Sequence, residues 1–98
     1  MIRFIRDKEI ETKIINYLTS KGAKKIEFFG SYVRGEKYND IDVIVEFDKW
    51  PDLFTFVRYQ LDLEKITGKK IDLIAGKEAI SKYILPFVIK EKRVIYER

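Results

Sequence analysis

Two apolar runs separated by a glycine turn and a polar stretch constrain the fold of this chain most strongly. The first run, Ile26–Phe29, ends at Gly30, and the second follows Asp40-Ile41-Asp42. Because side chains alternate along a strand, Asp40 and Asp42 are expected on one face. Their Cα atoms should lie about 6.6 Å apart, from a rise of about 3.3 Å per residue. Both carboxylates can then reach one divalent cation, or a pair of cations between them.

The turn between these runs has the features of a phosphate site. Gly30 permits close approach to the backbone, and Ser31 adds a hydroxyl and opens a short helix whose amides suit an anion. A plain strand-ending turn followed by two surface acids is the alternative. Arg34 can pair with phosphate or bond a carboxylate and so stabilise the loop, and both roles remain open. Together these residues predict Mg²⁺-dependent chemistry on a nucleotide, with Mn²⁺ as a substitute ion.

A third acidic residue, Asp72, lies within the apolar run around Ile71 and Leu73. Alternation places it on the same face as Ile74, opposite to Ile71 and Leu73. An acid inside a strand is unfavourable by propensity and therefore calls for a reason. If this strand pairs beside the second one, Asp72 joins Asp40 and Asp42. The alternative is an acid near an exposed strand end, paired with Lys69 or Lys70.

The apolar pattern predicts one α/β (α+β) domain over residues 1–98, with a small mixed sheet flanked by helices. Helices should cover one face of the sheet, and the carboxylates should lie on the other. The helix after Trp50-Pro51 has an apolar surface broader than one sheet needs. It either lies between the sheet and a C-terminal helix or meets a partner chain, and a homo-oligomer is one such arrangement.

The expected elements are a helix at 8–21 capped by Asp7, a strand at 24–29, a helical turn at 31–34, a strand at 41–47, a helix at 53–67, a strand at 69–75, a last helical region interrupted at Pro86, and an edge strand at 94–96.

Composition narrows the chemistry and the partners. The chain has no Cys and no His, so catalysis has to depend on carboxylates, Lys, Arg, Tyr and a hard metal ion. A net charge of +4 favours an anionic partner such as a nucleotide, a nucleic acid or an acidic protein. No run of about 18 apolar residues is present, so a soluble cytoplasmic protein without membrane association is expected.

The order G-S, R-G and D-I-D followed by apolar residues resembles the signature of the DNA polymerase beta-like nucleotidyltransferases. The chain is similar to their smallest members, the minimal nucleotidyltransferase (MNT) domains, which commonly act as antitoxins encoded beside a HEPN-domain toxin. The resemblance covers nearly the whole chain, Asp72 included. One departure is the spacing between G-S and D-I-D. It is eight residues here, Tyr32–Asn39, which is shorter than usual for the family.

The resemblance implies a role for each candidate residue. Ser31 and the amides near Gly30 would hold the β- and γ-phosphates of ATP, and Asp40, Asp42 and Asp72 would be the metal-binding and catalytic carboxylates. Asp72 would activate the attacking hydroxyl, on a tyrosine of a HEPN toxin. Two alternatives remain. The protein could neutralise its toxin by contact alone, with a vestigial site, or it could bind or modify RNA.

Overall fold

The structure is a computed structural model, and it describes residues 7–35, 40–76, 90 and 92–98. Each described element lies within one residue of its predicted bounds, whereas the helical region around Pro86 lies outside the described residues. The elements are α1 (Lys8–Ser20), β1 (Ala23–Phe29), α2 (Ser31–Arg34), β2 (Asp40–Phe47), α3 (Leu53–Thr67), β3 (Lys70–Ala75) and β4 (Arg93–Glu97).

Both long helices begin at an aspartate cap. The Asp7 side chain accepts a hydrogen bond from the Ile10 N–H at 3.2 Å, and Asp52 accepts one from the Thr55 N–H at 2.8 Å. These bonds satisfy amides that have no partner inside the helix. The Asp7 cap was predicted, whereas the start of α3 was predicted correctly after the Trp50-Pro51 turn but without Asp52 as its cap.

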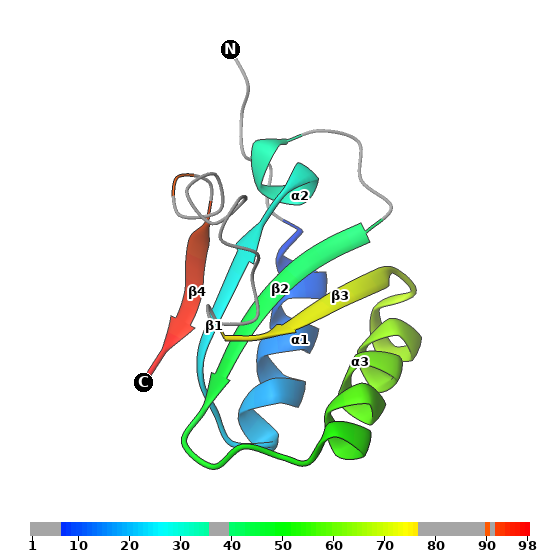
Figure 1. The fold of residues 1–98 in the computed structure, drawn as a ribbon. Coiled ribbons are helices and arrows are strands. Elements are labelled where there is room, and N and C mark those ends of the chain that lie inside the picture. The colour runs from blue at the N-terminus through cyan, green and yellow to red at the C-terminus, as the bar shows by residue number, and fades with distance from the viewer. Residues whose placement is uncertain (1–6, 36–39, 77–89, 91) are drawn as a thin grey trace.

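The four strands form one mixed sheet in the order β3-β2-β1-β4. β1 pairs antiparallel with both β2 and β4, and β2 pairs parallel with β3. A parallel pair needs a crossover connection, and α3 supplies it (Figure 1). Because β4 lies beside β1 at one edge, the predicted edge strand is confirmed.

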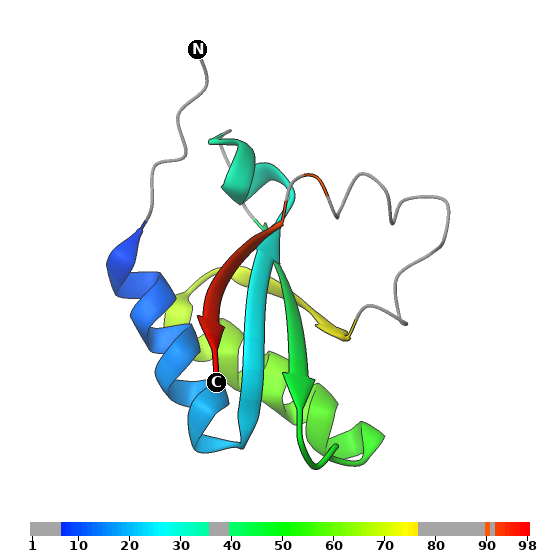
Figure 2. The same ribbon diagram turned by 90° about the vertical axis from the view of Figure 1, so that its left-hand side faces the viewer.

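The sheet has one helical face and one carboxylate-bearing face, as predicted. α1 and α3 pack side by side on the same face of the sheet (Figures 1 and 2). The side chains of β1, β2 and β3 that point toward these helices form the buried core with them: Ile26, Phe28, Ile41, Val43, Val45, Phe47, Ile71 and Leu73 from the strands, and Ile10, Ile14, Leu18 and Leu63 from the helices. On the opposite face, Ile44 packs with Phe29 and Ile74, and Asp42 and Asp72 follow in the same alternation.

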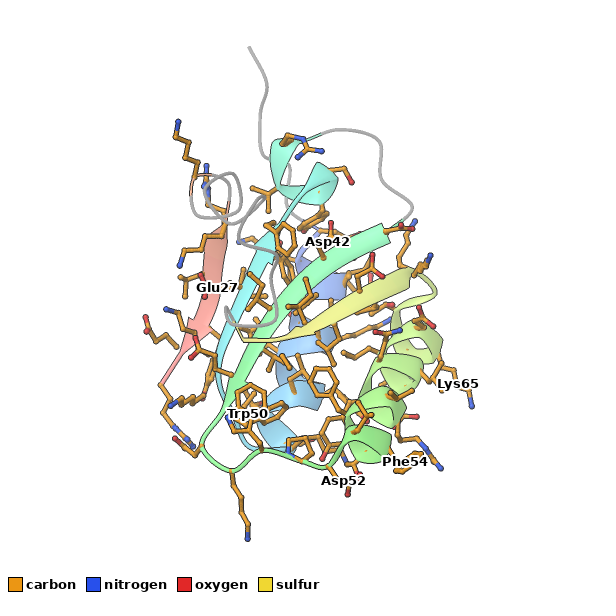
Figure 3. All side chains as sticks on the ribbon, viewed as in Figure 1. Glu27, Asp42, Trp50, Asp52, Phe54 and Lys65 are labelled. Atoms are coloured by element: carbon orange, nitrogen blue, oxygen red, sulfur yellow. The ribbon has the colours of Figure 1, made fainter. Side chains whose placement is uncertain are left out.

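The opposite face also holds a fully buried acid, Glu27, in the middle of β1. Figure 3 labels Glu27 on β1. Lys92 Nζ lies 2.9 Å from Glu27 Oε2, and Lys25 Nζ lies 3.7 Å from Oε1. Lys25 also approaches Glu97 at 3.6 Å. The pairs of Lys92 with Glu27 and of Lys25 with Glu97 connect β1 to β4 and to the residue that precedes it.

The two sides of α3 have different surroundings. Leu63 is fully buried against the core, and the Tyr17 hydroxyl of α1 donates to Asp62 Oδ2 at 2.6 Å. Burial raises the pKa of Tyr17, and the bond to Asp62 adds to the effect. Away from α1, Leu53 and Phe54 are 73% and 88% exposed, so part of the broad apolar surface meets solvent (Figure 3).

Within the described part of the chain, every helix is too short or too polar to cross a bilayer.

Candidate functional site

The parallel pairing of β2 with β3 brings two of the predicted carboxylates together. Asp42 and Asp72 are register partners, and Asp40 lies opposite Lys70, two residues closer to the N-terminal ends of the two strands. Phe29, the last residue of β1, is the partner of Asp42 on its other side. Figure 3 shows Asp42 at the end of the sheet nearest α2. The expectation that Asp72 joins the carboxylates of β2 is therefore confirmed for Asp42.

The carboxyl groups of Asp42 and Asp72 interact with each other. Burial, a hydrogen bond with the Asp72 side chain, and the negative charges of Asp72 and Asp40 raise the pKa of Asp42 to about 6. A hydrogen bond between two carboxyl groups requires a proton on one of them, so the pair retains a proton at mildly acidic pH. This arrangement is unfavourable when both groups ionise, and a bound cation would relieve it.

Gly30 lies directly against the Asp42 carboxylate. Its backbone has φ 83° and ψ −154°, a conformation that L side chains rarely adopt. A Cβ placed on Gly30 would lie 2.3 Å from Asp42 Oδ2, closer than atoms can pack. The requirement for glycine therefore comes from the carboxylate as well as from the backbone. Only the close approach of phosphate was predicted as the reason for this glycine.

The single turn of α2 begins directly after Gly30. The Arg34 N–H donates to the Gly30 carbonyl at 3.1 Å, and Gly35 ends the turn in the left-handed region at φ 75°. Ser31 is half-buried at the first position of this helix. The predicted glycine turn and helical turn are thus both present next to the carboxylates.

Arg34 is exposed at the end of α2, and its positive charge interacts electrostatically with Asp42. The guanidinium lowers the pKa of Asp42, against the larger effects that raise it. Arg34 therefore belongs to the electrostatic surroundings of the carboxylate pair. Pairing with phosphate and pairing with a carboxylate remain two alternatives for this residue.

The donor chemistry suits a hard divalent cation. Asp40, Asp42 and Asp72 offer only oxygen ligands, which Mg²⁺ and Mn²⁺ prefer, and the coupled pair carries charge that a cation would neutralise. Among the residues that the structure describes, no three acidic side chains are gathered closely enough to surround an ion. Asp42 and Asp72 therefore form the core of the candidate metal site, with Asp40 beside it on the same strand face.

Tyr32, beside the Gly30-Ser31 turn, was not among the predicted residues. It follows Ser31 directly and is fully buried, and its hydroxyl bonds to Glu11 in α1. A helix of four residues is too short to show a side-chain periodicity, so the sequence pattern does not indicate that its aromatic residue is buried. Glu11 lies on the same face of α1 as the buried residues Ile14 and Leu18. Because a buried carboxylate needs a hydrogen-bond donor, this position was the signal in the sequence that a buried donor lies nearby.

The sequence of this chain matches a known protein family. The polymerase beta nucleotidyltransferase family model matches residues 12–98. The protein adenylyltransferase MntA of Thermococcus cleftensis is 37% identical over 73 residues, which cover 69% of this chain and 74% of the relative. A relative from Methanocaldococcus jannaschii, whose name also assigns it to the protein adenylyltransferases, is 39% identical over 94 residues, or 91% of this chain and 92% of the relative.

Solved structures share the fold at lower identity. A crystal structure of a toxin-antitoxin complex with AMP-PNP matches with a TM-score of 0.75 and 24% identity, over 90% of this chain and 73% of that chain. A structure of the tri-AMPylated Shewanella oneidensis HEPN toxin in complex with its MNT antitoxin matches with a TM-score of 0.74 and 21% identity, over 95% and 74%. The family match spans most of the sequence and includes the glycine turn and all three carboxylates, and the chain therefore belongs to the polymerase beta nucleotidyltransferase family.

Proposed function

We propose that this protein is a protein adenylyltransferase that transfers AMP from ATP to a hydroxyl of a protein acceptor and acts as the antitoxin of a HEPN toxin. The adenylyltransferase relatives and the HEPN–MNT complexes with the same fold support this function. The observation that carries it is the Asp42–Asp72 pair, which adjoins the Gly30-Ser31 turn. A phosphate-binding turn next to a cation-binding pair is the arrangement that nucleotidyl transfer requires.

Each group has a distinct role in the proposal. The Ser31 hydroxyl and the amides at the start of α2 hold the β- and γ-phosphates of ATP, and Arg34 is available for the same phosphates. Asp42 and Asp72, with Asp40 beside them at the same end of the sheet, would hold the metal ions. A bound Mg²⁺ or Mn²⁺ supplies charge neutralisation at the attacking and leaving oxygens.

The transfer itself is an in-line displacement at the α-phosphorus. The acceptor hydroxyl oxygen forms a bond to the α-phosphorus, and the bond from that phosphorus to the oxygen bridging the α- and β-phosphates breaks, so that pyrophosphate leaves. Asp72 takes the proton of the attacking hydroxyl as general base. A tyrosine of the HEPN partner is the proposed acceptor.

Two other functions compete with this one. A non-catalytic antitoxin would bind the same toxin while the short Tyr32–Asn39 connection left the site inactive. An RNA-binding or RNA-modifying protein would use the net charge of +4 instead.

The decisive experiment measures AMP transfer and ATP affinity in parallel for wild type and Asp72→Asn. The variant keeps the size of the side chain but removes its basicity. Transfer to the HEPN-domain partner should fall by about 10²–10⁴-fold, the usual cost of a lost base, while ATP still binds. Near-normal transfer by the variant would falsify the role of Asp72 as base.

The same measurements separate the competing functions. Equal losses of ATP binding and transfer would make Asp72 a metal ligand only. A wild-type protein that binds the HEPN partner tightly but transfers no AMP would identify a non-catalytic antitoxin. RNA binding without affinity for the HEPN partner would support the third function.

A further inference from the structure

Tyr32 links α2 to the N-terminal end of α1 through its hydroxyl. The hydroxyl donates to Glu11 Oε2 at 2.5 Å and accepts from the Asp7 backbone N–H at 2.8 Å. Both bonding groups belong to the first turn of α1, where Asp7 is the cap and the Glu11 N–H donates to the Asp7 carbonyl at 3.0 Å. Tyr32 and Glu11 are 1% and 2% exposed, so the link is shielded from water.

α2 depends on such contacts for its position. With four residues it forms a single turn, which is far shorter than a helix that is stable on its own. The Tyr32 ring packs edge-on against Phe28 of β1, with centroids 5.4 Å apart, and Val33 is also buried. Ring packing sets how deeply α2 sits on the sheet. The two hydrogen bonds of the hydroxyl are directional and set how the turn is oriented.

The residues that this orientation controls are those proposed to hold the nucleotide. Gly30 and Ser31 directly precede Tyr32, and Gly30 contacts the Asp42 carboxylate. We propose that the Tyr32 hydroxyl is a positioning group: bonded to Glu11 and Asp7, it holds the Gly30-Ser31 turn at a fixed distance from the Asp42–Asp72 pair. This inference rests on the proposed function, because it assigns Tyr32 to the placement of ATP phosphates relative to the carboxylates. A displacement of about 1 Å in such a site can lower the rate by about 10²-fold.

A merely structural hydroxyl would behave differently. Its loss would lower the thermal stability, because a carboxylate would lose a donor in a buried place. At temperatures where the variant is fully folded, the affinity for ATP and the mobility of α2 would then be unchanged. The test therefore has to measure affinity and local opening in addition to stability.

The first comparison uses Tyr32→Phe and Tyr17→Phe in the full chain. Each variant removes a tyrosine hydroxyl that donates to a carboxylate in another helix, and the Tyr17–Asp62 bond joins α1 to α3 instead of α2. Calorimetry with ATP and Mg²⁺ well below the melting temperature should show an affinity about tenfold or more lower for Tyr32→Phe. Hydrogen exchange of the amides at 31–34 should be faster in that variant. Tyr17→Phe should leave both quantities at the wild-type level.

Two variants of Glu11 complete the test. Glu11→Gln keeps an oxygen that accepts from the Tyr32 hydroxyl, so ATP affinity should stay close to wild type. The double variant Tyr32→Phe/Glu11→Leu removes both polar groups of this bond, and its melting temperature is measured beside that of Tyr32→Phe. Its ATP affinity should remain low, because the link between the helices is still absent.

The outcomes separate this inference from the proposed function. Unchanged ATP affinity in Tyr32→Phe, or an affinity that recovers with stability in the double variant, would overturn the positioning role. A wild-type protein that does not bind ATP would refute the proposed function. The exchange rates of the α2 amides still decide the inference in that case. Faster exchange in Tyr32→Phe but not in Tyr17→Phe supports the link, and equal rates in all three proteins overturn it.

Discussion

Gly30 and Asp42 are in direct contact across the junction of β1 and β2, with the Asp42 carboxylate occupying the space that a side chain on residue 30 would need. An added Cβ would lie 2.3 Å from Asp42 Oδ2. The turn proposed to bind phosphate and the carboxylate proposed to bind metal are therefore parts of one packed unit. A change in either residue displaces the other.

We expect Gly30→Ala to impair metal-dependent ATP binding and to destabilise the fold, because the methyl group displaces the Asp42 carboxylate and the backbone is strained. Strain of this kind costs about 1–3 kcal/mol. Gly22→Ala is the matched control, since Gly22 also has a positive φ, 94°, but an added Cβ meets nothing within 4 Å. Urea denaturation and ATP calorimetry should show a stability loss in both variants and a loss of ATP binding in Gly30→Ala alone. Equal ATP affinities in the two variants would contradict the contact argument.

The raised pKa of Asp42 predicts how stability depends on pH in metal-free buffer. Its pKa rises from 3.8 to about 6 on folding, so between these values the folded state binds more protons than the unfolded state. The contribution of Asp42 to stability is therefore greatest below pH 4 and is lost as the pH rises through 6. Asp42→Asn should consequently be more stable than wild type at pH 8 and lose that advantage toward pH 4. Denaturation curves at both pH values, with a chelator present, test this. A constant difference between the two proteins would mean that Asp42 does not titrate in this range.

Divalent metal should raise the affinity for ATP, because it neutralises the charge that Asp40, Asp42 and Asp72 concentrate at one end of the sheet. Titration calorimetry of wild type with ATP should show tighter binding with Mg²⁺ or Mn²⁺ than with a chelator. Asp42→Asn should abolish that difference. Glu9→Gln is a suitable control, since Glu9 pairs with Lys13 on the exposed side of α1. Equal affinities with and without metal, in wild type and in Asp42→Asn, would remove the metal site from the proposal.

The exposed apolar side of α3 predicts association with a partner chain. Phe54→Ser should change the free energy of unfolding by less than about 0.5 kcal/mol, because the side chain is 88% exposed. Leu63→Ala on the buried side should cost about 2–5 kcal/mol. We expect Phe54→Ser to weaken binding to the HEPN-domain partner without changing ATP affinity. Mass measurements that show only monomers of wild type mixed with this partner would count against a docking role for α3.

Local patterns in the sequence determined most of the fold. The bounds of α3, the capped start of α1 and the strand around Asp42 were predicted because each depends on neighbouring residues: side-chain periodicity, a capping aspartate and a terminating glycine. The same alternation assigned Asp72 to the face opposite Ile71 and Leu73. The candidate site was accessible from sequence because its residues cluster within two short segments.

The tertiary structure decided what depends on contacts between distant segments. The alternation of side chains predicts which face of a strand each residue occupies but not the register between strands. Only the parallel pairing of β2 with β3 sets Asp42 directly beside Asp72. The contact between Gly30 and Asp42 and the bond from Tyr32 to Glu11 join residues 12 and 21 positions apart. No local pattern encodes these pairings, because their geometry depends on how helices and strands pack together. The sequence by itself therefore predicted the glycine turn and the three carboxylates as candidates, and the tertiary structure decided which of these residues touch.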